Sequence, residues 1–221
     1  MKGMPETKME EILSRKISLT PVTKLLSNKT LILDLDDTLV HTVDETKKYS
    51  QKDLKDAEVN IVHYYEPKKG VKIDIKFIIR PFALSFLQEI SSYFEVISFT
   101  ASERPYADAI IDKIDPEKNI FDYRLYRDKC IHIKNVWVKN LGIFQNRELK
   151  NLIIVDNTIS TFRDNMENGI YIPSFRGEIK DRELINLGDF LKSIILEEDV
   201  RIKIKEKYSL SSMYKVFLKN N

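Results

Sequence analysis

The sequence predicts an α/β fold in which a parallel β-sheet is covered on both faces. Short apolar runs with the length of buried strands alternate along the chain with segments of helical periodicity. These runs span residues 31–35, 94–100, 152–156 and 170–172. Strands alternating with helices are typical of a parallel sheet, because each crossover returns the chain to the same edge.

Length and composition indicate one soluble domain. The 221 residues suffice for a sizeable core, and 43% of them are hydrophobic and 32% charged, as in globular proteins. The net charge of +2 argues against direct contact with nucleic acid or an anionic membrane. No apolar run approaches the roughly 20 residues of a membrane span. Residues 1–30 resemble neither a secretory signal nor a transit peptide, and the single Cys130 excludes an internal disulfide. We expect an intracellular monomer, nuclear or cytoplasmic or both.

The central domain is expected to span residues 30–197, with an extension at each end. Pro5, followed by apolar residues at helical spacing, predicts a short amphipathic helix that Pro21 ends. We expect this helix, within residues 1–29, to pack on the domain; docking to a partner is the alternative. The Lys-rich tail, residues 198–221, is expected to be a solvated helix or disordered.

The segments between the buried runs differ in character. Residues 43–58 are polar and are predicted to form a loop. Residues 59–65 and 71–79 carry strand-forming patterns, and the Pro and Gly between them predict a β-hairpin. Residues 121–138 are expected to be irregular. Helices are expected over residues 82–93, 105–114 and 181–197, the first of them burying Phe82, Leu84, Phe86, Leu87 and Ile90.

Two carboxylates stand at the end of the first buried run. Asp34 and Asp36 are two residues apart, so in an extended strand both side chains point the same way and can face one reacting centre. Burying paired carboxylates is unfavourable by several kcal/mol unless a cation or proton compensates for them. A catalytic or metal-binding pair is therefore favoured over an acidic turn, which is the structural alternative.

Two further buried runs also end in polar residues. Thr100 ends one and Asp156-Asn157 another, and ligands of open α/β sheets bind beyond the carboxyl ends of the strands. Oxygen ligands of this kind suit Mg²⁺. A carboxylate such as Asp34 can attack phosphorus, and Asp36 can protonate the leaving alkoxide. The pattern predicts metal-assisted phosphoryl transfer.

Four segments also resemble the motifs of a known family. Asp34-Leu-Asp-Asp-Thr38 resembles the first motif of the haloacid dehalogenase superfamily. In its longer form, residues 33–42, it is similar to the small C-terminal-domain phosphatases, the NLI-interacting-factor-like family. Residues 99–108, 137–141 and 152–170 resemble that family's second, third and fourth motifs. The family usually has Glu at the position of Asp37, and it commonly has Asp-Asn-Ser-Pro at residues 156–159.

The resemblance implies a Rossmann-like fold of the haloacid dehalogenase type, with a small β-hairpin insertion and no large cap domain. It makes Asp34 the nucleophile that becomes an aspartyl-phosphate, and Asp36 the general acid and base. Thr100 and Lys139 become phosphate ligands. The implied Mg²⁺ shell consists of Asp34, Asp156, Asn157 and the backbone carbonyl of Asp36.

The resemblance further implies a Mg²⁺-dependent phosphatase that acts on phosphoserine and phosphothreonine in a phosphorylated protein or peptide, such as the RNA polymerase II C-terminal repeat. An open site suits side chains on protein better than free metabolites. Tyr106, Lys134 and Trp137 fall where the family contacts its peptide; core packing is the alternative for Trp137. A small-metabolite phosphatase and a non-catalytic adaptor of the same fold are the alternative functions.

Three smaller expectations concern residues outside these motifs. Ile61, Tyr64 and Tyr65 of the predicted hairpin either form an apolar docking surface or cover the sheet. Arg80 is expected to support the site or the sheet edge rather than to catalyse. The three histidines lie far apart in the sequence without ligand spacing, so zinc is not expected.

Overall fold

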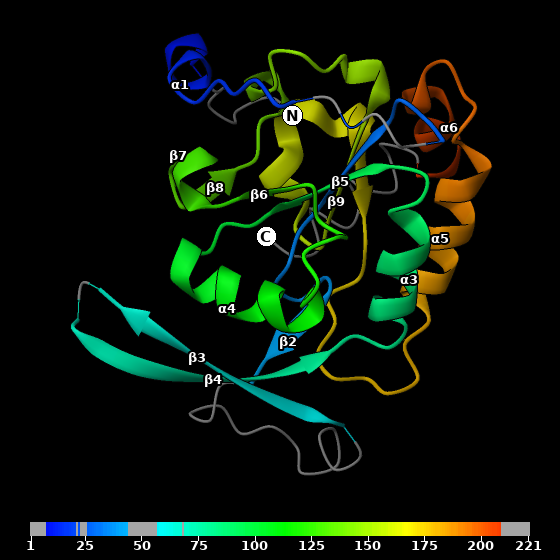
Figure 1. The fold of residues 1–221 in the computed structure, drawn as a ribbon. Helices are drawn as coiled ribbons and strands as arrows, with labels where there is room; N and C mark the ends of the chain where they lie inside the picture. The colour runs from blue at the N-terminus through cyan, green and yellow to red at the C-terminus, as the bar shows by residue number, and fades with distance from the viewer. Residues whose placement is uncertain (1–7, 21, 23–25, 44–56, 68, 209–221) are drawn as a thin grey trace.

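The computed structural model describes residues 8–20, 22, 26–43, 57–67 and 69–208. Its centre is a five-stranded sheet in the order β10-β9-β1-β5-β6, in which every neighbouring pair is parallel (Figure 1). The strands are β1 (Thr30–Leu33), β5 (Glu95–Phe99), β6 (Tyr123–Leu125), β9 (Leu152–Asp156) and β10 (Gly169–Tyr171). The predicted parallel sheet is confirmed.

The sheet separates two apolar cores. Leu31 and Leu33 of β1 point into one core, and Ile32 points into the other, because successive side chains of a strand alternate between faces. The first core is completed by the α-helices α3 (Ala83–Ile90), α4 (Arg104–Ile114), α5 (Glu183–Ser193) and α6 (Val200–Lys207). The second is covered by short 3₁₀ helices, chiefly η2 (Leu141–Ile143) and η4 (Ile159–Asn168). Burial on both faces explains why these strands read as continuous apolar runs.

A second, antiparallel sheet has the order β2-β4-β3 and lies beside the carboxyl end of β1 (Figure 1). Its strands are β2 (Val40–Thr42), β3 (Val59–Glu66) and β4 (Val71–Ile79). Strands β3 and β4 form the predicted hairpin. Gly70 has a φ of 65° at its turn, a left-handed conformation that favours glycine. We call this the hairpin sheet.

The segment 121–138 is more regular than expected. Strand β6 joins the main sheet, and β7 (Ile131–Ile133) pairs with β8 (Val136–Val138) in an antiparallel ladder. Strands of three residues are too short to give a readable period in the sequence. Within the described ranges, the additions to the main sheet are therefore two small antiparallel sheets and no large cap domain.

Two of the five residues expected to face inward on the first long helix do not. Phe82 is 46% exposed and Leu84 is 44% exposed, whereas Phe86, Leu87 and Ile90 are buried. Phe82 has a left-handed φ of 67° and precedes α3 rather than belonging to it. The helix therefore begins one residue later than expected, and its apolar stripe runs through Ala83 instead.

Both ends of the described chain pack on the domain. Helix α1 (Met9–Leu13) places Ile12 against the second core, and Ile17 forms a β-bridge with Phe144. At the other end, Val200 and Ile204 anchor α6 in the first core. The expectation of a solvated helix is therefore met only on the outer face of α6. Residues 1–7, Pro21, most of the predicted 43–58 loop and residues 209–221 lie outside the described residues. None of the described helices has the length and apolar character that a bilayer crossing requires.

Candidate active site

The carboxyl ends of three neighbouring strands bring the predicted acids together with one lysine. Asp34 follows β1, Asp156 ends β9, and the Lys139 Nζ lies 2.5 Å from Asp34 Oδ1 and 2.6 Å from Asp156 Oδ2. Thr100 follows β5, and its hydroxyl lies 3.5 Å from Asp36 Oδ2. These five predicted residues therefore form one group, which we call the aspartate cluster.

The ionic core of the aspartate cluster is almost completely buried. Asp34 is 6% exposed, and Asp156 and Lys139 are 1% exposed. Burial, followed by the Asp156 carboxylate, raises the pKa of Asp34 to about 7, although Lys139 acts in the opposite direction. Burial acts to lower the pKa of Lys139, but the carboxylates of Asp156 and Asp34 outweigh it and raise that pKa above its usual range. The lysine thus stays charged and compensates one of the two carboxylates.

Mg²⁺ would supply the missing positive charge, and the oxygen atoms present suit it. The Thr38 hydroxyl donates to Asp34 Oδ2 at 3.0 Å and lies 3.5 Å from Asn157 Oδ1, so a carboxylate and an amide oxygen meet at one hydroxyl. Among the described residues, no group of three or more His, Cys, Asp and Glu side chains could hold a metal ion. The candidate Mg²⁺ shell would instead combine two carboxylates with one amide and a backbone carbonyl. Such a shell leaves room for several waters, as Mg²⁺ prefers and zinc does not.

Local hydrogen bonds orient Asp156 and Asn157 at the end of β9. Asp156 Oδ1 accepts from the backbone N–H of Thr158 at 2.8 Å, which leaves Oδ2 for Lys139. Asn157 Nδ2 donates to Ser174 Oγ at 2.9 Å, and this bond turns its amide oxygen toward Thr38. The side chains that would bind a cation are therefore oriented by their own neighbours.

The backbone turn after β1 places Asp36 beside Asp34. Asp37 has a left-handed φ of 59°, and its N–H donates to the Val40 carbonyl at 2.7 Å. The Asp37 carbonyl in turn accepts from the N–H of Phe175 at 2.8 Å. An Asp tolerates this conformation better than most residues, which is consistent with a short acidic side chain at this position.

Three residues to which the sequence assigned no role contact the aspartate cluster or the neighbouring Asn157. Thr38 hydrogen-bonds to Asp34, Ser102 Oγ donates to Asp36 Oδ2 at 2.8 Å, and Ser174 holds Asn157. Thr38 is the last residue of the Asp-Leu-Asp-Asp-Thr motif and could have been found there. Ser174 carries no such signal, because its contact depends on the course of the loop after β10.

The three residues expected to contact a peptide occupy different places. The Tyr106 hydroxyl lies 2.5 Å from Asp36 Oδ1, inside the site. Lys134 is exposed at the turn between β7 and β8, with a φ of 54°. Trp137 is half-buried against the second core, with the Arg127 guanidinium 5.2 Å and the His132 ring 4.3 Å from its ring. Core packing thus accounts for part of the Trp137 surface.

Arg80 supports the turn that carries the acids. Its guanidinium is fully buried and makes two bonds to Asp181, at 2.9 and 2.7 Å, and a third to the Thr38 carbonyl at 3.1 Å. This geometry agrees with the expected structural role.

We predict that Arg80→Met lowers the free energy of unfolding by about 3–5 kcal/mol, because it leaves Asp181 without its partner. Urea denaturation of the variant measures the loss. Adding Asp181→Asn is expected to recover part of it, and a double variant less stable than Arg80→Met alone would contradict this account.

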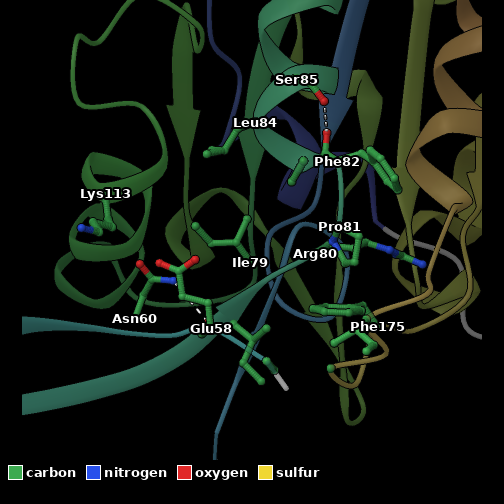
Figure 2. A pocket seen from close by; sticks show the side chains of 15 residues that line it. Glu58, Asn60, Ile79, Arg80, Pro81, Phe82, Leu84, Ser85, Lys113 and Phe175 are labelled. Atoms are coloured by element: carbon green, nitrogen blue, oxygen red, sulfur yellow. Dashed lines mark hydrogen bonds between the residues drawn. The ribbon is translucent and has the colours of Figure 1, made fainter. Parts of the chain in front are cut away.

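A cavity of about 710 Å³ lies apart from the aspartate cluster, between the hairpin sheet and the start of α3. Figure 2 shows Ile79, Arg80, Phe82 and Phe175 around it. None of the predicted site residues lines it. The chemistry of the side chains, rather than the size of a cavity, therefore identifies the candidate active site.

Comparisons with known proteins identify the family of the chain. Residues 29–201 match the family model of the NLI interacting factor-like phosphatases. CTD small phosphatase-like protein 2 of Dictyostelium discoideum is 38% identical over 180 residues, which cover 81% of this chain and 30% of that protein. Nuclear envelope morphology protein 1 of Schizosaccharomyces pombe is 35% identical over 179 residues, covering 80% of this chain and 35% of that protein. The chain spans about a third of the length of these two relatives.

The fold is also similar to that of a solved structure, the fission yeast RNA polymerase II CTD phosphatase Fcp1 bound to beryllium fluoride. The TM-score is 0.56 at 21% identity, and the match covers 87% of this chain and 56% of that one. This chain, a parallel sheet flanked by helices, thus shares its overall fold with that phosphatase structure. The chain belongs to the NLI interacting factor-like phosphatase family.

Proposed function

We propose that the protein is a Mg²⁺-dependent phosphatase that removes phosphate from phosphoserine and phosphothreonine in proteins. The observation that carries this proposal is the aspartate cluster, in which two buried carboxylates, Asp34 and Asp156, share the single ammonium group of Lys139. Such a group is electrostatically incomplete without a further cation. Membership of a phosphatase family supports phosphate ester hydrolysis as the reaction that uses it.

In the first step of the proposed reaction, a carboxylate oxygen of Asp34 attacks the phosphorus atom. The bond between phosphorus and the serine oxygen breaks as Asp36 gives its proton to that oxygen. Lys139 and Thr100 donate hydrogen bonds to the phosphoryl oxygens, whose charge spreads in the transition state. Asp34 now carries the phosphoryl group.

In the second step, water attacks the phosphorus atom of the aspartyl-phosphate. Asp36 takes a proton from that water, the bond to the Asp34 oxygen breaks, and inorganic phosphate leaves. Asp34, Asp156, Asn157 and the backbone carbonyl of Asp36 would hold the Mg²⁺ ion. When bound, this ion neutralises charge on the phosphoryl group, so that one anion can approach another.

The names of similar proteins guide the proposal of substrate and location. Fcp1 is an RNA polymerase II CTD phosphatase, and one relative is named for nuclear envelope morphology. We therefore propose a phosphorylated protein as substrate, with that C-terminal domain as the first candidate, and a nuclear-associated location. The retained Asp34, Asp36, Lys139 and Asp156 argue against a non-catalytic adaptor.

The proposed function is tested by metal removal. Hydrolysis of p-nitrophenyl phosphate is expected to fall by at least about 10²-fold in EDTA, because the uncompensated carboxylates repel phosphate, and to return with Mg²⁺. The thermal midpoint should also rise with Mg²⁺ concentration, and it should rise less in Asp156→Asn. Full turnover in excess EDTA would refute the proposal. A panel of phosphopeptides and small phosphorylated metabolites then identifies the substrate class.

A further inference from the structure

Both carboxylate oxygens of Asp36 accept hydrogen bonds from hydroxyl groups. Tyr106 donates to Oδ1 at 2.5 Å, and Ser102 donates to Oδ2 at 2.8 Å. The Thr100 hydroxyl lies 3.5 Å from the same Oδ2. An aspartate side chain has two rotatable bonds, and hydrogen bonds to both oxygens restrict rotation about each.

The Tyr106 hydroxyl is itself held from the hairpin sheet. It lies 2.5 Å from the Thr42 hydroxyl at the end of β2, and the Tyr106 ring meets Tyr64 of β3 edge to face, with centroids 6.2 Å apart. Helix α4 carries Tyr106 and fixes its backbone. Burial, followed by the Asp36 carboxylate, raises the pKa of Tyr106, so the phenol keeps its proton near neutral pH. A neutral hydroxyl can donate or accept a hydrogen bond.

We propose that Tyr106 is a positioning residue that holds Asp36 in place for proton transfer, with Thr42 fixing the tyrosine from the hairpin sheet. This inference rests on the proposed function, because it needs Asp36 to act as acid and base. It assigns Tyr106 a different task from the peptide contact that the sequence implied. Since a proton donor must lie within hydrogen-bond reach of the leaving oxygen, a carboxyl group free to rotate would spend less time in the productive geometry.

The hydroxyl suits both steps of the proposed reaction. When Asp36 is ionised and receives a proton from water, Tyr106 can donate to it. When Asp36 carries on Oδ2 the proton that the leaving oxygen will take, its Oδ1 is still an acceptor, and Tyr106 can keep donating to it. The hydrogen bond between the two side chains can therefore persist while the proton moves.

The test compares two aryl phosphates in the full chain with Mg²⁺. Dinitrophenolate leaves readily without a proton, whereas phenolate needs one. In Tyr106→Phe, kcat/KM for phenyl phosphate is expected to fall by about 10- to 100-fold, and kcat/KM for dinitrophenyl phosphate by less than about threefold. Thr42→Val should lower kcat/KM for each of the two aryl phosphates, but by a smaller factor than Tyr106→Phe does. This parameter reports the step in which the leaving group departs, so slow hydrolysis of the aspartyl-phosphate does not obscure it.

Tyr126→Phe provides a matched control. Its hydroxyl is also hydrogen-bonded to an aspartate, at 2.6 Å, but that residue is Asp108. Both aryl phosphates should be hydrolysed by this variant as by the wild type.

The outcomes separate the alternatives. Equal losses for both aryl phosphates in Tyr106→Phe would overturn the inference, since they would indicate damage to the whole site. Unchanged aryl phosphates with a lower kcat/KM on a phosphoserine peptide would also overturn it and make Tyr106 a substrate contact. A wild-type protein that hydrolyses no phosphate ester would instead refute the proposed function, and the inference with it.

Discussion

Asp34→Asn is expected to abolish turnover and to leave the metal-free protein at least as stable as the wild type. Turnover of p-nitrophenyl phosphate should fall by at least about 10³-fold, because an amide cannot attack phosphorus and no aspartyl-phosphate forms. The side chain keeps its size, so packing around it is unchanged. Activity and stability are thus expected to move in opposite directions, as they do where a site holds unfavourable charge.

The pH dependence of stability gives the sign of this effect. Burial and the Asp156 carboxylate raise the pKa of Asp34 from 3.8 to about 7 in the folded protein. The folded state therefore binds this proton more tightly than the unfolded state, and stability is lost as the pH rises from about 4 to about 7. Asp34→Asn lacks this titration and should lose less stability over the same range.

Urea denaturation in EDTA, repeated at several pH values, measures this difference. The variant should match the wild type at acidic pH and equal or exceed it above pH 7. Retained turnover in a correctly folded Asp34→Asn protein would exclude this residue as the nucleophile. A variant that is less stable than the wild type at every pH would show that the carboxylate is favourable where it lies.

Lys139→Met is expected to reduce both activity and stability. The change leaves Asp34 and Asp156 buried and facing each other without their ammonium group, a loss that costs about 3–5 kcal/mol in comparable ion pairs. The penalty should decrease at acidic pH, because the carboxylates then take up protons. Turnover should fall by about 10²- to 10³-fold, because Lys139 is proposed to donate to the phosphoryl oxygens and its charge is lost.

Two further variants separate the contributions of Lys139. Asp156→Asn in the Lys139→Met background should recover stability but not turnover, since it removes the repulsion without restoring the cation. Lys150→Met removes a partly exposed lysine paired with Glu148 at 3.2 Å, and it should change stability by less than about 1 kcal/mol. Equal stability of Lys139→Met and the wild type in EDTA would contradict the buried ion-pair account.

The strands and the first long helix show where sequence patterns are informative. The buried runs of β1 and β9 were predicted correctly, because strands buried on both faces are apolar throughout. The inward face of α3 was predicted only in part. A left-handed residue at Phe82 shifts the start of the helix, and no periodicity in the sequence signals that conformation.

By itself, the sequence determined the nature of the fold and of the chemistry. Asp34 and Asp36 lie two residues apart directly after a buried run, which placed both acids at the carboxyl end of one strand, although the turn after β1 sets how they face each other. Parallel strands end at a common edge, which placed Thr100 and Asp156 near them. These inferences needed only local periodicity and the alternation of strands and helices.

Only the tertiary structure decided how Lys139, which the family resemblance singled out among 36 lysine and arginine residues, reaches the acids and what orients them. Lys139 reaches Asp34 because its backbone N–H is tied to the Thr161 carbonyl at 2.6 Å, across more than twenty residues of chain. The partnership of Tyr106 with Asp36 spans a helix and a turn in the same way. Contacts between distant segments depend on how whole elements pack, and the identity of a single residue does not encode that packing.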